Sequence, residues 1–393
     1  MKKSKAMLQS LKRVLRRELR IIFSHRIYLF CTTAAPKFCF VLFATLMNEG
    51  LPTELPVAMV DADNTPLSRH ITRKLDAMQQ INIVKRCANI HDATQAMRRE
   101  NIYAIYHIPQ GTEQRLIEGE QPTLSYYLNY SYLVAGSLTY RDMYITSLLA
   151  NASVGEALLL ARGATEKQAA NFVQPIIIET NALGNPWLSY AVYLNNTLFP
   201  GVLSLLIFIL TAYSITQEIK HRTAAKWLQS ADNNIFIAIT GKLLPQTVLY
   251  SLTAIFYNIF LYKCLHYPLN TPLMNMIAAS LLFVVASQSL GLFFASALPS
   301  PRWAMSIASL WGVVSFSISG FSFPIEGMSS SIQAATNLFP LRHYFMIYCN
   351  DALLGFSPAY AWAHYAALLA FCMLPFLLIK RLKYALKHYG YVE

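Results

Sequence analysis

Six long apolar runs constrain this chain more than any other feature of its sequence. Each has about the 20 residues that a helix needs to cross the hydrocarbon core of a bilayer. The runs are Ile27–Met47, Tyr190–Tyr213, Ile235–Tyr262, Leu273–Leu298, Trp303–Phe323 and Tyr360–Ile379. Only 13% of the residues are charged, about half the share found in ordinary soluble domains. The sequence therefore predicts a polytopic α-helical membrane protein with six transmembrane helices, the first over 27–47 and the other five forming a bundle over 189–380.

Basic residues at the ends of these runs predict the orientation of the chain. The net charge is +12, but a nucleic-acid-binding protein would gather its Lys and Arg on a water-facing surface. Segment 1–26 has nine Lys or Arg and one acid, Glu18, and the tail over 381–393 is also basic. Short basic flanks of this kind stay in the cytoplasm. We therefore expect both termini to be cytoplasmic, membrane lipid to surround the spans, and nucleic acid not to be a partner.

The first segment, 1–26, has the pattern of an amphipathic helix. Its apolar residues recur at helical spacing with Lys and Arg between them: Met7, Leu8, Leu11, Leu15, Leu19 and Ile22. Such a helix lies at a membrane surface with its apolar side in the lipid. We expect a cytoplasmic helix on the inner leaflet that also anchors the orientation of the first span.

Between the first and second spans, residues 48–188 form a long, more polar insert. Short β-rich runs alternate there with helical runs, beginning with a strand over 56–61, a helix over 66–79 and a strand over 81–86. This alternation is typical of βαβ units with a mostly parallel sheet. Because the first span starts in the cytoplasm, the insert is predicted to be an extracytoplasmic α/β domain between transmembrane helices 1 and 2.

The strand that opens the insert ends in Asp61 and Asp63. This pattern resembles the nucleophile motif of haloacid-dehalogenase-type phosphatases, but no adjacent pair of Asp residues follows to hold their metal. The favoured interpretation is local: an Asx turn made by Asp63 or Asn64, then Thr65 as the N-cap of a helix that begins with Pro66. We predict that both carboxylates are structural.

Neither a nucleotide site nor a metal site is predicted in this chain. The pair Gly241-Lys242 lacks the first Gly and the Ser or Thr of a phosphate-binding loop. The six cysteines show no ligand spacing. Of these, Cys87, Cys264 and Cys349 lie where they could meet an oxidising compartment, and a disulfide among them stays open. We expect no cofactor and no enzymatic site of its own.

Two candidate sites lie at and inside the spans. Lys37 falls in the middle of the first span, where an ionisable side chain either lines a pathway or makes a buried contact with another subunit. The loop over 217–232 reads as a short cytoplasmic helix with an apolar edge. Such a helix either seats in a groove of a soluble partner or lies in the membrane interface with Trp227 in the aromatic belt.

Together these residues resemble the permease subunit of ABC-2-type exporters. Four parts of the chain carry the resemblance: the loop residues Glu218, Thr223, Trp227 and Leu228; the start of the third span, Gly241, Lys242, Leu243 and Pro245; the start of the insert, Val57, Val60, Asp61, Asp63 and Ser68; and the run Leu183–Trp187 with the segment Phe323–Met328 followed by Pro340, His343 and Tyr344. The resemblance covers nearly the whole chain, and the order and spacing of the motifs are what carry it.

The resemblance implies a function and a set of partners. It implies an exporter of drugs, lipids or polymer precursors in the bacterial inner (cytoplasmic) membrane, with ATP bound by separate ABC ATPase subunits and with a second permease copy or a related permease completing the pathway. A periplasmic membrane-fusion adaptor is a further candidate partner. The coupling residues would be Glu218, Arg222, Thr223, Trp227 and Leu228, and the pathway or interface residues Lys37, Pro340, His343 and Tyr344, with an outer re-entrant segment over 324–350. The alternative is a membrane receptor or assembly scaffold whose extracytoplasmic domain binds a partner.

Overall fold

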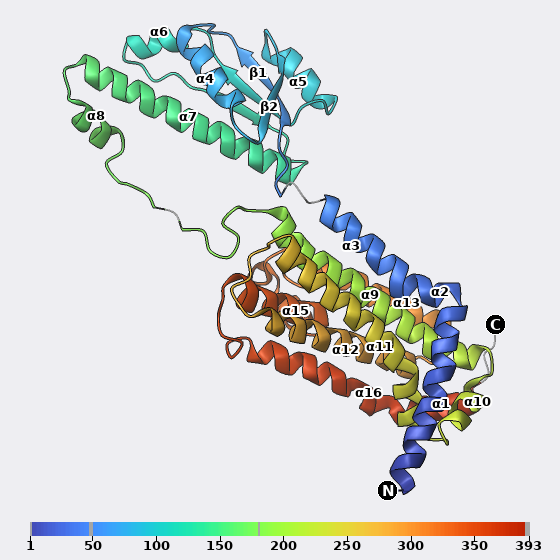
Figure 1. The fold of residues 1–393 in the computed structure, drawn as a ribbon. Helices are drawn as coiled ribbons and strands as arrows, with labels where there is room; N and C mark the ends of the chain where they lie inside the picture. The colour runs from blue at the N-terminus through green and yellow to red at the C-terminus, as the bar shows by residue number, and fades with distance from the viewer. Residues whose placement is uncertain (1, 47–49, 180, 390–393) are drawn as a thin grey trace. The chain divides into compact units, whose positions relative to one another are not determined.

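The computed structural model describes residues 2–46, 50–179 and 181–389. It divides into two compact units: a helical unit, Met1–Asn48 with Ala182–Glu393, and an α/β unit, Glu49–Asn181 (Figure 1). The insert is thus a separate body in the middle of the chain, and each unit is described by itself.

Helices, most of them long, make up most of the helical unit. They are, in chain order, α1 (Lys2–Ser24), α2 (Arg26–Leu29), η1 (Phe30–Ala34), α3 (Ala35–Leu46), α9 (Tyr190–Lys220), α10 (Ala224–Ser230), α11 (Ile235–Ile259), η2 (Phe260–Cys264), α12 (Leu273–Ala297), α13 (Pro301–Ile318) and α16 (Trp362–His388). Local signals start several of them: Ser189 and Asn234 accept backbone N–H bonds as N-caps of α9 and α11, and Pro301 opens α13. Because α16 continues to His388, the residues predicted as a tail from 381 are mostly helical.

Short, broken helices connect α13 to α16. They are η3 (Ile325–Gly327), α14 (Ser330–Thr336), α15 (Pro340–Ile347) and η4 (Tyr348–Leu353). The segment predicted to be re-entrant, 324–350, therefore consists of one short turn, two helices of seven and eight residues, and the beginning of η4. Side chains of α15 are buried in the largest apolar core of the unit, together with residues of α9, α11 and α12. Irregular backbone enclosed by protein in this way is tolerated at membrane depth.

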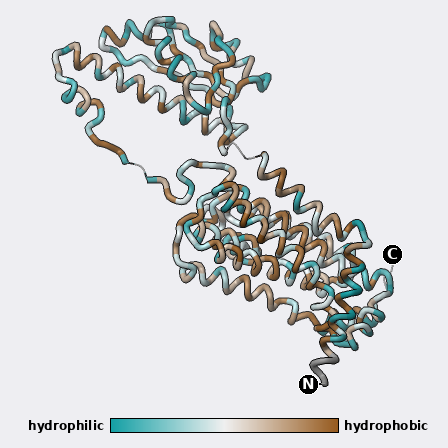
Figure 2. The backbone as a smooth tube through the Cα atoms, viewed as in Figure 1, coloured by the Kyte–Doolittle hydropathy of each residue, from teal (hydrophilic) through white to brown (hydrophobic). Residues whose placement is uncertain are grey.

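Six described helices are long and apolar enough to cross a bilayer. They are Arg26–Leu46, Leu133–Ala161, Tyr190–Lys220, Ile235–Cys264, Leu273–Ala297 and Trp362–His388. Five coincide with predicted spans, and the chain is a polytopic helical membrane protein. The apolar stretches dominate the helical unit in Figure 2. The predicted span Trp303–Phe323 is different: its helix, α13, ends at Ile318 and is not among the six, because Pro301, Arg302 and several Ser lower its hydropathy.

The α/β unit contains a four-stranded sheet of order β2-β1-β3-β4. Its strands are β1 (Leu55–Asp61), β2 (Ile81–Arg86), β3 (Ala104–Ile108) and β4 (Ser125–Leu128), and its helices are α4 (Pro66–Asp76), α5 (Ile90–Arg98), α6 (Thr112–Ile117), α7 (Leu133–Ala161) and α8 (Glu166–Val173). The first three strands are parallel and β4 is antiparallel to β3. The predicted alternation of strands and helices is present.

Helices cover both faces of this sheet. Val57 and Met59 of β1 pack with α4 and α7 on one face, while Ala58 and Val60 pack with α5 on the other. Helix α7 is long and apolar enough to span a membrane, yet its buried side faces the sheet, where the carboxylate of Asp142 accepts a hydrogen bond from the Gln80 backbone. The sheet covers only one stripe of α7, which includes Met143 and Ala150, whereas large apolar side chains such as Leu148 and Leu149 are exposed.

The predicted turn and helix cap are present after β1, but Asp61 makes the Asx turn, and not Asp63 or Asn64 as predicted. Asp61 accepts hydrogen bonds from the backbone of Asp63 and Asn64 at 3.1 and 2.9 Å, and Thr65 forms a capping box with Ser68 at the start of α4. Asp63 accepts the Thr112 N–H at 2.9 Å and so also caps α6. The second contact was not predicted, because the two segments are far apart in sequence.

A buried charge cluster joining four helices

Helix α1 packs against the rest of the helical unit along a face that its sequence did not reveal. Residues four apart are buried: Ser10, Val14, Glu18 and Ile22. Gly241 of α11 permits this contact, since a Cβ there would lie 2.7 Å from a Val14 methyl carbon. The prediction of a helix lying on the inner leaflet is therefore corrected in part. Met7 and Leu8 are exposed, as a lipid-facing side requires, but the neighbouring face is embedded in protein.

Three charged residues meet beneath this contact. The ammonium group of Lys242 in α11 donates to Glu18 of α1 at 2.9 Å and to Glu218 of α9 at 2.8 Å. All three side chains are at most 5% exposed. A buried charge is costly unless partners of opposite sign surround it. Lys242 therefore holds α1, α9 and α11 together, because a helix that moved away would leave a buried charge without its partner.

Arg17 completes what we call the charge cluster: Arg17, Glu18, Glu218 and Lys242. Its guanidinium group binds both carboxylate oxygens of Glu218, at 2.7 and 2.9 Å, and also contacts Glu18. Burial acts to lower the pKa of Arg17, but the two carboxylates outweigh it and the pKa is raised. The cluster contains two cations and two anions, so it carries no net charge.

The next segment of the chain, α10, is tied to the same cluster. The Thr223 hydroxyl, immediately before α10, donates to Glu218, and Lys242 Nζ lies 4.9 Å from the centre of the Trp227 ring. Ala224, Trp227 and Leu228 are buried against α1, α9, α11 and α16. A displacement of α10 would therefore disturb Glu218 and Lys242 directly.

Two expectations about this segment are corrected. Glu218 belongs to α9 and not to the short helix, and its carboxylate is satisfied within the chain. Trp227 is 0% exposed, so it neither inserts into a groove of a partner nor sits in the membrane interface. The predicted apolar edge of Ala224, Trp227 and Leu228 is present, but it packs inside this chain, where α1 and α16 cover it.

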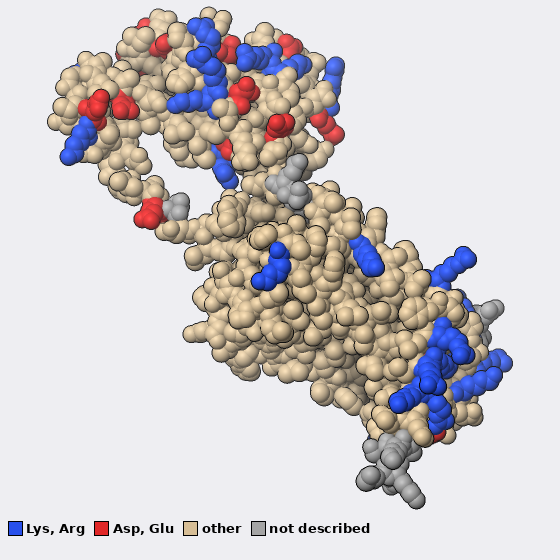
Figure 3. Space-filling view, in the orientation of Figure 1, with Lys and Arg blue, Asp and Glu red and all other residues tan. Residues whose placement is uncertain are grey.

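The outer side of α10 remains on the surface. Arg222, Ala225, Lys226 and Gln229 are exposed, and Arg222 has a φ of 56° in the turn that reverses the chain after α9. Lys and Arg gather at this end of the helical unit in Figure 3, whereas the visible sides of the bundle carry very few. The exposed side of α10 and the turn before it therefore carry two basic side chains, Arg222 and Lys226.

The other predicted residues lie apart from the cluster. Lys37 is exposed on α3, so its role at a pathway or a subunit contact stays a prediction. Pro340 begins α15, where its missing N–H costs nothing. His343 approaches the Asn337 carbonyl at 3.0 Å and His364 Nδ1 at 3.1 Å, and Tyr344 stacks on Phe283 and contacts the Ser280 hydroxyl. These contacts hold α15 in the bundle.

Sequence reasoning named Glu218 but missed Arg17, Glu18 and Lys242 as its partners. Two signals were available. Glu18 is the one acid in a segment of nine basic residues, and Lys242 lies within an apolar run, where a charged side chain needs a partner. No spacing rule connects them, because the two are 224 positions apart.

The fold and this cluster define a multi-pass membrane protein in which a small surface helix is locked to several long helices. The sequence profile of the ABC-2 family transporter proteins matches residues 26–379, nearly the whole chain. The chain therefore belongs to the ABC-2 transporter family, whose membrane components are permeases that imply ABC ATPase partners. A search of curated proteins finds no match.

Proposed function

We propose that this chain is the permease subunit of an ATP-driven exporter in a bacterial inner membrane, with α10 and both termini on the cytoplasmic side and the α/β unit outside. Family membership and the basic end of the helical unit support this orientation. We further propose that α13 is the sixth span, since it packs against α9 and α12, and that α7 is not a span. The chain would act as a dimer or with a related permease, with a periplasmic adaptor as a further candidate partner.

The charge cluster is the observation that supports coupling. In this proposal an ATPase subunit binds the exposed side of α10 and displaces it during its catalytic cycle. Thr223 and Trp227 then transmit the displacement to Glu218 and Lys242, and from there to α9, α11 and α1. Glu218 is thus an internal coupling residue, while Arg222 and Lys226 form the contact surface.

Charge reversal on the outer side of α10 tests the contact. Lys226→Glu should reduce copurification of the ATPase subunit at least tenfold. A partner surface that complements the basic side of α10 is acidic, and it would repel the new carboxylate. The melting temperature of the permease should not change, since Lys226 is exposed. Lys167→Glu is the matched control: an exposed lysine on α8 of the other unit.

A second variant separates coupling from contact. Glu218→Gln should lower the ATP hydrolysis per assembled complex, because the amide cannot neutralise Arg17 and Lys242. Since the substitution also destabilises the permease, hydrolysis is measured only on complex that has copurified. If Lys226→Glu copurifies and hydrolyses ATP like the wild type, the α10 surface is not the ATPase contact. That result would favour the alternative interpretation of the chain as a receptor or scaffold.

A further inference from the structure

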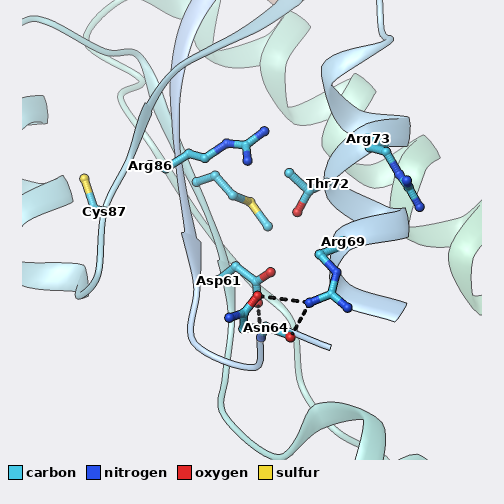
Figure 4. A pocket seen from close by; sticks show the side chains of 8 residues that line it. Asp61, Asn64, Arg69, Thr72, Arg73, Arg86 and Cys87 are labelled. Atoms are coloured by element: carbon cyan, nitrogen blue, oxygen red, sulfur yellow. Dashed lines mark hydrogen bonds between the residues drawn. The ribbon is translucent and has the colours of Figure 1, made fainter. Parts of the chain in front are cut away.

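The α/β unit has a cavity of about 420 Å³ at the carboxyl ends of β1 and β2. Met59 and Asp61 of β1 form one side of it, Arg69, Thr72 and Arg73 of α4 form another, and Arg86 closes it from the end of β2. Figure 4 shows Arg86 extending towards α4, with Asp61 and Asn64 at the turn below. We call this cavity the arginine groove after Arg69, Arg73 and Arg86.

A β-bulge aims Arg86 into the groove. Val57 pairs with Ile83, but the next residue, Ala58, pairs with Lys85, so Val84 is an extra residue in β2. Arg86 is thereby opposite Met59, whose side chain points to the α4 face of the sheet. Without the extra residue, strict alternation would have placed Lys85 on that face. The irregular strand therefore presents a guanidinium group where a regular one would present an amine.

Helix α4 supplies the facing groups from one side of its surface. Arg69, Thr72 and Arg73 are three and four residues apart, the spacing that places side chains together on a helix. The Arg69 guanidinium group is held by the Asn64 carbonyl and side-chain oxygens at 2.8 and 3.2 Å. This contact fixes its position while leaving other N–H donors of the guanidinium group for a ligand.

The positive charge of the groove is not neutralised by the chain. Among the residues that the structure describes, Arg73 and Arg86 form no ion pair. The one carboxylate present, that of Asp61, is occupied: one oxygen accepts two backbone N–H bonds and the other accepts the Ser68 hydroxyl at 2.7 Å. Three guanidinium groups thus face a concave space with one acid that is already hydrogen-bonded.

We propose that the arginine groove binds a small molecule bearing a phosphate group. Guanidinium forks match phosphate oxygens in geometry and in charge, whereas the Thr72 hydroxyl adds no donor because it already donates to the Ser68 carbonyl at 2.9 Å. The groove lies at the carboxyl ends of parallel strands, the end of an open α/β sheet at which ligands bind, although it is between β1 and β2 and not at the β1–β3 switch point. The volume lies in the range of small-molecule pockets, so the phosphate would be part of a larger organic molecule. This site is independent of the ATPase contact and goes beyond the proposed transport function.

Binding of inorganic pyrophosphate to the purified full-length protein tests the proposal. The probe should bind saturably to protein in phosphatidylcholine nanodiscs, and Arg86→Gln should weaken it about tenfold or more, as expected for a lost charge-assisted hydrogen bond. Lys85→Gln is the matched control: it removes the same charge from the adjacent position on the opposite face of β2. Neither residue is buried, so both variants should fold.

Phosphatidic acid in the nanodiscs identifies the source of the phosphate. Unchanged pyrophosphate affinity supports a soluble ligand. If phosphatidic acid lowers the pyrophosphate affinity of the wild type and of Lys85→Gln alike, the result supports occupation of the groove by a lipid headgroup. The proposal is overturned if pyrophosphate does not bind saturably below about 10 mM, or if Arg86→Gln and Lys85→Gln weaken binding equally. No ATPase subunit takes part, so failure here would leave the proposed transport function untouched.

Discussion

The two units use charged side chains in opposite ways. In the helical unit, Glu18, Glu218 and Lys242 are at most 5% exposed and satisfy one another. In the α/β unit, the three arginines of the groove are exposed, and the carboxylate that lines the groove with them, that of Asp61, is already hydrogen-bonded to other groups. In the first arrangement the charged groups bind one another, whereas the second leaves its donors to solvent.

This difference shows what burial does to the meaning of a charge. A buried, neutral cluster connects helices firmly. If one charged group is removed, its partner is left unpaired in a medium of low dielectric, which is costly. An exposed set of like charges contributes little to folding, and its hydrogen-bond donors stay available to a ligand. Mutations should therefore affect folding in the first region and binding in the second.

The largest effect is expected for Lys242→Ala. Removal of the ammonium group leaves Glu18 and Glu218 facing each other in a buried site, with only Arg17 to compensate. Loss of one partner from a buried pair costs about 3–5 kcal/mol, so the melting temperature of the detergent-purified protein should fall steeply. Arg86→Ala in the exposed groove should leave it nearly unchanged.

A neutral replacement sharpens the same comparison. The triple variant Lys242→Met, Glu18→Gln, Glu218→Gln removes the buried charges together and should recover much of the lost stability. A single Lys242→Ala variant as stable as the wild type would show that Glu18 and Glu218 do not depend on Lys242 for compensation, and the assignment of the cluster as a stabilising connection would be wrong.

A moderate effect is expected at a helical glycine in each unit. Gly241→Ala would bring a methyl group to 2.7 Å from the Val14 side chain, and overpacking of this kind costs about 1–3 kcal/mol. Gly155→Ala in α7 meets only ordinary contact, the nearest atom being 3.5 Å away, and should stabilise by about 0.5–1 kcal/mol. Melting temperatures that shift in opposite directions confirm that α1 is docked closely; parallel shifts would contradict it.

Local signals made much of the fold predictable. Apolar length alone located five spans, and Thr65 with Pro66 marked the start of α4 because an N-cap acts over three residues. The span around Trp303 was set too long because serines and the turn at Gly320, with its φ of 97°, end the helix early.

The sites were less predictable because their contacts are distant in sequence. Glu218 was recognised by resemblance, but its burial depends on α1 arriving from 201 positions away to bring Arg17. The arginine groove depends on one extra residue in β2, Val84, which no alternation rule reveals. In both cases the charged residues could be recognised in the sequence, but their partners could not. Only tertiary structure determines which face of a helix or strand is covered.

The smallest effect is expected at the exposed counterpart of the cluster, where α1 meets the turn after α10. There Ser10 and Arg13 hydrogen-bond to Asp232 and hold the pKa of its carboxyl below the ordinary value of 3.8. A carboxyl with a lowered folded pKa stabilises the protein above its unfolded pKa, and this contribution is lost as the pH falls through the folded pKa.

Asp232→Asn should therefore lower the melting temperature slightly at pH 7, and the difference from the wild type should shrink as the pH falls below about 4. Because the Arg13 and Asp232 side chains are 55% and 53% exposed, added salt should shrink it too. Melting curves at both pH values, with and without salt, measure this directly. A large, salt-independent loss for Asp232→Asn would mean that this contact is as enclosed as that of Lys242, and the contrast between buried and exposed charge along α1 would not hold.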